Sequence, residues 1–76
     1  MSKIDKIIFK MMNQPNGIRF SEVTKVLKAY GYIERSNSGT SHRNFINDNG
    51  DVITIPHKSP LKAVYVKEII HRLGIK

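Results

Sequence analysis

Apolar residues recur with helical spacing at the start of the chain. Four of them stand at i, i+3, i+4 and i+7 and so share one face of a helix, namely Ile4, Ile7, Ile8 and Met11. Ser2 is a suitable N-cap before this run, and Pro15 and an Asn-Gly pair within residues 13–17 interrupt it. The pattern predicts a first helix over residues 3–12 that packs against the rest of the protein through its apolar face.

Two further apolar stripes predict two further helices. The first has Ser21 as its expected N-cap and Gly31 as its expected stop. The second begins between residues 60 and 64, after a Ser59-Pro60 pair typical of a helix start, and ends before Gly74. The stripes consist of Val23, Val26, Leu27 and Tyr30 in the former and of Val66, Ile69, Ile70 and Leu73 in the latter.

Three short extended runs, residues 32–35, 41–46 and 52–55, lie between these helices. Turn-forming residues at 37–39 and 48–51 separate them, and Pro56 ends the third run, in which β-branched residues dominate. Two tight turns between three runs predict an antiparallel meander. We therefore expect an α+β fold of order α-α-β-β-β-α, with a three-stranded antiparallel sheet packed on helices. It forms one domain over residues 1–76, with residues 1–15 as an N-terminal helical extension.

Charge narrows the choice of partners. Thirteen Lys and Arg residues against six Asp and Glu residues give a net charge of +7, spread along the 76 residues. A small basic domain favours an anionic partner, and nucleic acid is the commonest one. An anionic membrane surface, an acidic protein, or a charge that serves solubility alone are the alternatives. The absence of cysteine excludes disulfides and thiolate metal sites, and no stretch is apolar enough to span a membrane.

His42 is the residue best suited to chemistry. Strand alternation places it on the face opposite Phe45, so that if Phe45, Ile53 and Ile55 face the helices, His42 faces outward. An outward histidine beside Arg43 is suited to a phosphodiester, although an ordinary surface histidine explains the position as well.

The segment around His42 resembles the core of the HicA family of toxin ribonucleases. Residues 39–45 read Gly-Thr-Ser-His-Arg-Asn-Phe, followed by Asn-Gly at 49–50 and Ile-Thr-Ile-Pro at 53–56. Lys58, Lys62 and residues 64–70 are similar to the family's basic segment and final helix, and residues 16–23 are similar to its lead-in. The resemblance covers most of the chain, and it rests on the order and spacing of these pieces.

This resemblance implies a fold similar to the double-stranded-RNA-binding domain and a cytoplasmic toxin that cleaves mRNA, with His42 essential. It also implies a cognate HicB-type antitoxin that masks His42. Family members with a shorter pattern read Gly-Ser-His, so either Thr40 or Ser41 is the hydroxyl nearest the histidine. The expected chemistry needs no metal or cofactor, because RNA carries its own 2′-hydroxyl nucleophile and a histidine can act as the general base.

Other residues have weaker assignments. Arg43, Lys58, Lys62 and Lys67 are the expected RNA contacts. His57 is a possible auxiliary acid, whereas His71 suits the end of a helix. The spacing of the three histidines matches no metal motif. A non-catalytic double-stranded-RNA-binding module is the alternative function, and a DNA-binding repressor is a third, disfavoured because no helix has a polar, base-reading face.

Overall fold

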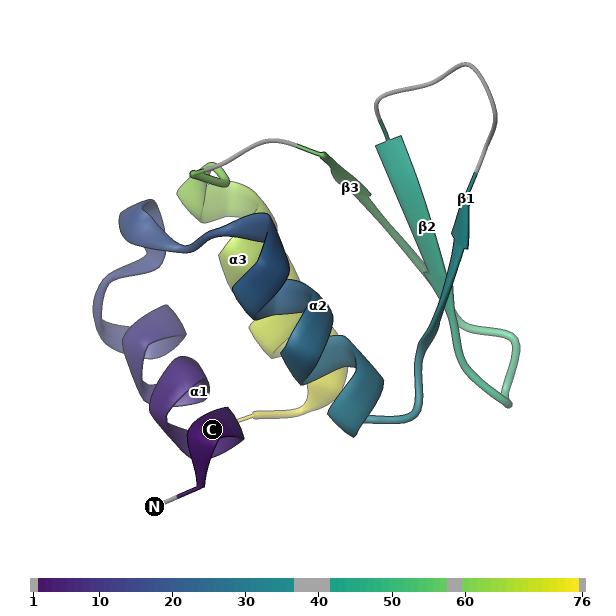
Figure 1. The fold of residues 1–76 in the computed structure, drawn as a ribbon, viewed down its shortest axis with the longest axis horizontal. Helices are drawn as coiled ribbons and strands as arrows, with labels where there is room; N and C mark the ends of the chain where they lie inside the picture. The colour runs from purple at the N-terminus through teal and green to yellow at the C-terminus, as the bar shows by residue number, and fades with distance from the viewer. Residues whose placement is uncertain (1, 37–41, 58–59, 76) are drawn as a thin grey trace.

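The computed structural model describes residues 2–36, 42–57 and 60–75, and Figure 1 shows how their elements are arranged. The described part has the predicted order α-α-β-β-β-α and is an α+β fold. Its helices are α1 (Lys3–Asn13), α2 (Phe20–Ala29) and α3 (Ala63–Leu73), with a 3₁₀ turn, η1, at Pro15–Gly17. Its strands are β1 (Ile33–Ser36), β2 (His42–Ile46) and β3 (Val52–Pro56).

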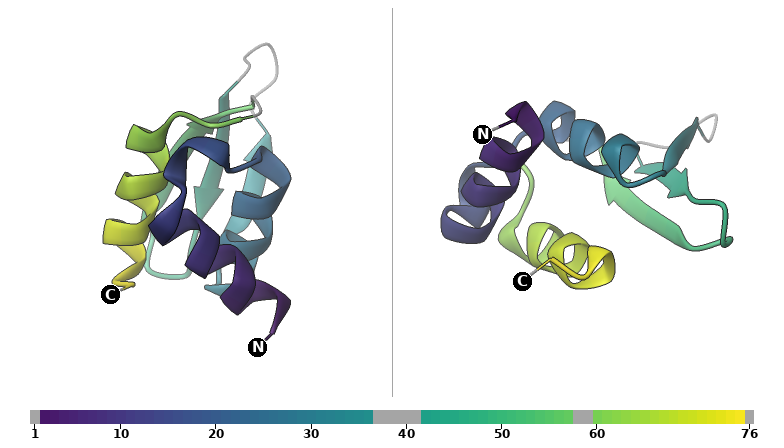
Figure 2. Two further views of the ribbon diagram at one scale, coloured as in Figure 1. Left: turned by 90° about the vertical axis from the view of Figure 1, so that its left-hand side faces the viewer. Right: turned by 90° about the horizontal axis from the view of Figure 1, so that it is seen from below.

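The elements form three layers. The sheet lies on one side, α2 and α3 pack against one of its faces, and α1 lies beyond these two helices, on their far side from the sheet (Figures 1 and 2). No helix in the described part of the chain covers the other face of the sheet. We refer to that uncovered face as the open face.

Helix α1 follows its prediction. The Ser2 hydroxyl accepts a hydrogen bond from the Asp5 backbone N–H at 3.1 Å, which satisfies one of the free N–H groups of the first turn. Ile7 and Met11 are buried, while Ile4 and Ile8 are partly buried against the core. The apolar stripe therefore docks α1 onto the other helices.

Helix α2 begins two residues earlier than predicted. Its N-cap is Arg19, and Ser21 lies inside the first turn, so the prediction of Ser21 as the cap is wrong. The reason is that the Glu22 carboxylate, three residues into the helix, accepts a hydrogen bond from the Arg19 backbone N–H at 3.0 Å and so fixes Arg19 as the cap residue. Tyr30 also departs from the predicted stripe. It is the C-cap and is 43% exposed, because the chain leaves the helix there.

The three strands pair in the order β1-β2-β3, both pairs antiparallel, as expected for a meander. The turn between β2 and β3 contains Gly50 at φ +82°, a left-handed conformation that a residue with a Cβ rarely adopts. The Asn47 side-chain oxygen accepts hydrogen bonds from the backbone N–H groups of Asn49 and Asp51 at 3.0 and 2.8 Å. This turn sets the β2–β3 register.

Helix α3 begins within the predicted interval. Its N-cap is Lys62, so Pro60 precedes the helix and does not occupy its first turn as predicted. Ser59, the predicted cap, lies outside the described residues, as does the predicted turn at 37–39. Gly74 ends the helix in the left-handed conformation, with φ +70°.

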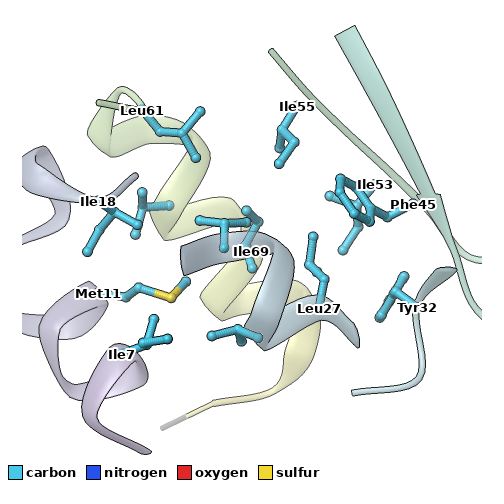
Figure 3. Packing of buried hydrophobic residues seen from close by; sticks show 13 residues of the cluster. Ile7, Met11, Ile18, Leu27, Tyr32, Phe45, Ile53, Ile55, Leu61 and Ile69 are labelled. Carbon is cyan, nitrogen blue, oxygen red and sulfur yellow. The ribbon is translucent and has the colours of Figure 1, made fainter. Parts of the chain in front are cut away.

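The core extends from the sheet to α2 and α3 and on to α1 (Figure 3). Phe45, Ile53 and Ile55 point from the sheet toward the helices and are at most 3% exposed, as the strand alternation predicts. Helix α1 contributes Ile7 and Met11, and the segment before α2 contributes Ile18. The other buried members are Val23, Val26, Leu27, Tyr32, Leu61, Val66 and Ile69.

A polar cluster ties the sheet to α3 at the end remote from His42. The Tyr32 hydroxyl donates to Asp51 Oδ2 at 2.6 Å, and Arg72 Nη2 donates to Asp51 Oδ1 and to the Val52 carbonyl, the latter at 2.9 Å. The Tyr32 hydrogen bond, followed by that of Arg72, lowers the pKa of Asp51 below its usual value. The same bond from Tyr32 to Asp51 raises the pKa of the tyrosine. Asp51 is therefore held in its ionised form at the base of the hairpin.

Candidate functional site

His42 is the first residue of β2, and its side chain is exposed. Its cross-strand partner is Pro56, the last residue of β3. Because successive strand residues point to opposite faces, the burial of Phe45 places His42 on the open face. The expectation that His42 faces away from the core is confirmed.

Three cross-strand rows make up the open face. His42 and Pro56 form the row at the upper edge in Figure 1, in which His42 is exposed and Pro56 is buried, and the next row is Arg35, Asn44 and Thr54. In that row the Thr54 hydroxyl donates to the Asn44 side-chain oxygen at 2.6 Å. The open face is therefore polar and hydrogen-bonding beside the histidine.

The third row of the open face is apolar. It consists of Ile33, Ile46 and Val52, which are in register across the three strands. Ile33 is 65% exposed and Val52 is 45% exposed. Large aliphatic side chains aligned in this way on an uncovered sheet face are suited to contact with another macromolecule.

Arg43 does not lie on the face that carries His42. As the next residue along β2, it points toward the helix side, and its cross-strand partners are Ile55 and Ser36. Its guanidinium lies 3.9 Å from a Glu34 carboxylate oxygen, with both side chains about a third exposed. The structure thus separates two residues that the sequence suggested would act side by side.

His57 lies at the same edge of the sheet as His42, one residue beyond its partner Pro56, and is exposed. Its imidazole meets the ring of Phe20 edge-on, with centroids 4.5 Å apart and an interplanar angle of 72°. Phe20 in turn packs against Phe45, with centroids 6.2 Å apart. The first residue of α2 therefore positions the His57 ring through an aromatic contact with the core.

Phe20 is a site residue that sequence reasoning missed. Its position three residues before Val23 and seven before Leu27 continues the apolar stripe of α2, which is the signal that could have found it. The prediction that Ser21 caps the helix placed Phe20 outside the helix and hid this signal.

Two helices begin at this same end of the molecule. The Leu61 backbone N–H donates to the Ile18 carbonyl at 2.8 Å, which holds the segment before α3 against the segment before α2. The N-termini of α2 and α3 therefore lie at the upper edge of Figure 1, where β2 begins and β3 ends. Each helix N-terminus carries a partial positive charge from its dipole.

The predicted basic residues of this region are only partly described. Lys62 is exposed at the N-cap of α3, and Lys67 is exposed on the same helix. Three predicted residues, Thr40, Ser41 and Lys58, lie outside the described residues. Among the residues it describes, the structure places His42, His57 and Lys62 at one end of the molecule, with His42 on the open face and the His57 ring against Phe20 on the helix side of the sheet.

The remaining histidine is remote from this end. His71 is exposed in the last turn of α3, where a cation suits the helix dipole. Within residues 2–36, 42–57 and 60–75, no group of three or more His, Asp or Glu side chains could hold a metal ion. In these same ranges, no helix is both long enough and apolar enough to cross a membrane.

Comparison with known proteins identifies a family. A family described as the HicA toxin of bacterial toxin–antitoxin systems matches residues 20–75, which include α2, β1, β2, β3 and α3 and leave out α1 and η1. No curated protein and no solved structure matches the chain.

Proposed function

The chain belongs to the HicA family of toxins from bacterial toxin–antitoxin systems, and on that premise we propose that it is a metal-independent endoribonuclease that cleaves mRNA with His42. The observation that carries the proposal is the position of His42, exposed at the start of β2 on an uncovered sheet face. A histidine so placed can meet an RNA strand without any rearrangement of the core.

The chemistry is an internal displacement at phosphorus. The His42 imidazole removes the proton of the RNA 2′-hydroxyl, and the 2′-oxygen attacks the adjacent phosphorus. A 2′,3′-cyclic phosphate forms and the bond to the 5′-oxygen breaks. DNA has no 2′-hydroxyl and is not cut. Positioned general-base catalysis of this kind contributes about 10²–10⁴-fold to the rate.

His57 is the proposed acid for the leaving 5′-oxygen. It lies at the same edge of the sheet as His42, and its ring is held by Phe20. A general acid needs a fixed position relative to the bond that breaks, and the edge-on contact supplies one. The hydroxyl of Thr40 or Ser41 is the proposed auxiliary beside His42.

Cations at this end of the molecule would hold the phosphate. Lys62 and Lys67, together with Lys58, are the proposed RNA contacts, and the N-terminus of α3 adds its partial charge beside Lys62. Arg43 is the fourth proposed contact, and it would meet RNA from the helix side of the sheet. The order of α2, the sheet and α3 is that of the double-stranded-RNA-binding domain, in which the start of the last helix meets phosphates.

A HicB-type antitoxin is the proposed partner, and the open face is the surface we propose it covers. The apolar row of Ile33, Ile46 and Val52 offers contact area on the same face as His42. Binding there would mask the histidine directly. The active toxin would act in the cytoplasm, where mRNA is found.

The test compares wild type, His42→Ala and His71→Ala on a long RNA in the presence of EDTA. His71 is the matched control, since it is also exposed and lies at the opposite end of the molecule. Wild type and His71→Ala should cut, and His42→Ala should lose about 10²–10⁴-fold in rate. Melting temperatures should agree for all three, because a surface substitution costs within about 0.5 kcal/mol. Equal cleavage by His42→Ala would remove the histidine from the mechanism.

A further inference from the structure

We propose that the surface where α1 crosses α2 is a second phosphate-binding surface that carries RNA outside the histidine end. It is formed by five lysines on the two helices, namely Lys3, Lys6, Lys10, Lys25 and Lys28. We call it the lysine surface. It rests on the proposed function for the identity of its ligand. Three of its five lysines lie on α1, outside residues 20–75 that match the family.

Helical spacing places three of these lysines on one edge of α1. Lys3, Lys6 and Lys10 are separated by three and four residues, so they are neighbours along the helix surface. This edge is turned toward α2, because the Lys10 ammonium lies 3.3 Å from both Glu22 carboxylate oxygens. At 1.5 Å per residue the edge is about 10 Å long, comparable to three nucleotide steps of about 3.4 Å along the axis of a duplex.

The lysines of α2 continue the same surface. Lys25 follows Glu22 by three residues and Lys28 follows Lys25 by three, so each is a neighbour of the residue before it. Both are exposed, whereas Val23, Val26 and Leu27 occupy the buried side of α2. Figure 2 shows α1 crossing α2 on the outer side of the helix layer.

Four of the six acidic residues of the protein lie away from this surface. Glu34, Asp48, Asp51 and Glu68 belong to the sheet, its hairpin or α3. Three of them are in ion pairs there, Glu34 with Arg43 and both Asp51 and Glu68 with Arg72. In the described part of the chain, Glu22 is the one carboxylate that forms an ion pair with a lysine of the surface. Five positive charges against one make this region a strong electrostatic site for a polyanion.

The remaining acidic residue of α1, Asp5, does not neutralise the edge. It is five residues from Lys10, which turns it about 140° away around the helix, and its backbone N–H is the group that Ser2 caps. Five lysines gathered at a helix crossing, with Glu22 as their one ion-pair partner in the described part of the chain, favour the RNA backbone over a solubilising surface, which would have mixed signs.

The test measures salt dependence of binding to a labelled RNA whose 2′-hydroxyls are all methylated, so that it cannot be cut. The variant is Lys6→Gln/Lys25→Gln, which keeps helix propensity. The matched control is Asn49→Asp/His71→Glu, which lowers the net charge by the same two units at exposed positions of the hairpin and the end of α3. Single-stranded and double-stranded forms of the RNA are compared.

The lysine variant should reduce the slope of log K against log salt by about 1.4 for a single strand, at 0.7 per lost contact. If the variant and the wild type bind RNA with equal affinity at 1 M salt, this change in slope makes the variant bind about 25-fold more weakly than the wild type at 0.1 M salt. The control should keep the wild-type slope. A lysine variant with the wild-type slope would overturn the proposal. So would normal RNA binding combined with weakened binding of the antitoxin, since the surface would then serve a protein.

Cleavage of unmodified RNA separates this inference from the proposed function. If the proposed function holds, the lysine variant should lose kcat/KM and keep kcat, because His42 is untouched. If wild type binds RNA with a lysine-dependent slope and cuts none, the proposed function fails and the lysine surface stands.

Discussion

Replacing Met11 by alanine tests whether α1 is an integral part of the fold. Met11 is fully buried and lies on the face of α1 that contacts the other helices. Met12, its neighbour, is 45% exposed on the other side of the same helix. The two substitutions remove the same atoms from the same helix, so their difference measures the packing of α1.

The size of the effect follows from burial and chain length. Truncating a buried Met to Ala costs about 2–5 kcal/mol, and we take about 3 kcal/mol as the central value. The unfolding entropy is about 2.1 cal/mol/K per residue, or about 160 cal/mol/K for the 76 residues of this chain. Dividing the destabilisation of about 3 kcal/mol by this unfolding entropy gives a fall in Tm of about 19 °C for Met11→Ala. Met12→Ala should change stability by at most about 0.5 kcal/mol, or about 3 °C.

Thermal unfolding followed by circular dichroism at 222 nm measures both values, and calorimetry checks that the transition is two-state. If Met11→Ala melts within a few degrees of Met12→Ala, α1 does not pack as described. The lysine surface would then also lose its basis, because it requires α1 to lie across α2.

Three further predictions concern the candidate site and the polar cluster. Phe20→Leu removes the edge contact to His57 at a cost in folding stability under about 1.5 kcal/mol. It should lower kcat about as much as His57→Ala does. Unchanged kcat in both variants would exclude His57 as the acid. Lys62→Gln should lower the salt slope of RNA binding by about 0.7–1. Arg43→Gln should lower it equally, because Arg43 is a proposed contact on the helix side of the sheet, and an unchanged slope would exclude Arg43 as a contact. Because the pKa of Asp51 is lowered in the fold, its contribution to stability is present above the unfolded value near 3.8 and is lost as pH falls through the folded value. Asp51→Asn should therefore melt lower than wild type at pH 7, with the difference shrinking below about pH 4 in acid titrations.

Local signals in the sequence were sufficient for the elements of this protein. The stripe containing Ile7 and Met11 predicted α1, and the Ser2 cap is observed. The turn containing Gly50 predicted the β2–β3 hairpin, since few residues other than glycine adopt its backbone conformation. Strand alternation also predicted correctly that Phe45 is buried and His42 exposed. These features depend on residues a few positions apart, and periodicity reports such relations directly.

What the sequence alone could not determine depends on contacts between distant segments. Arg43 pairs with Glu34 of another strand, and His57 meets Phe20, 37 positions earlier in the chain. The ion pair between Lys10 of α1 and Glu22 of α2 likewise joins residues of two different helices. Periodicity shows which residues share a face, whereas only the packing of one element on another decides what that face meets. For this reason the sequence predicted His42 as the candidate catalyst, while its surroundings and the lysine surface were visible only in the tertiary structure.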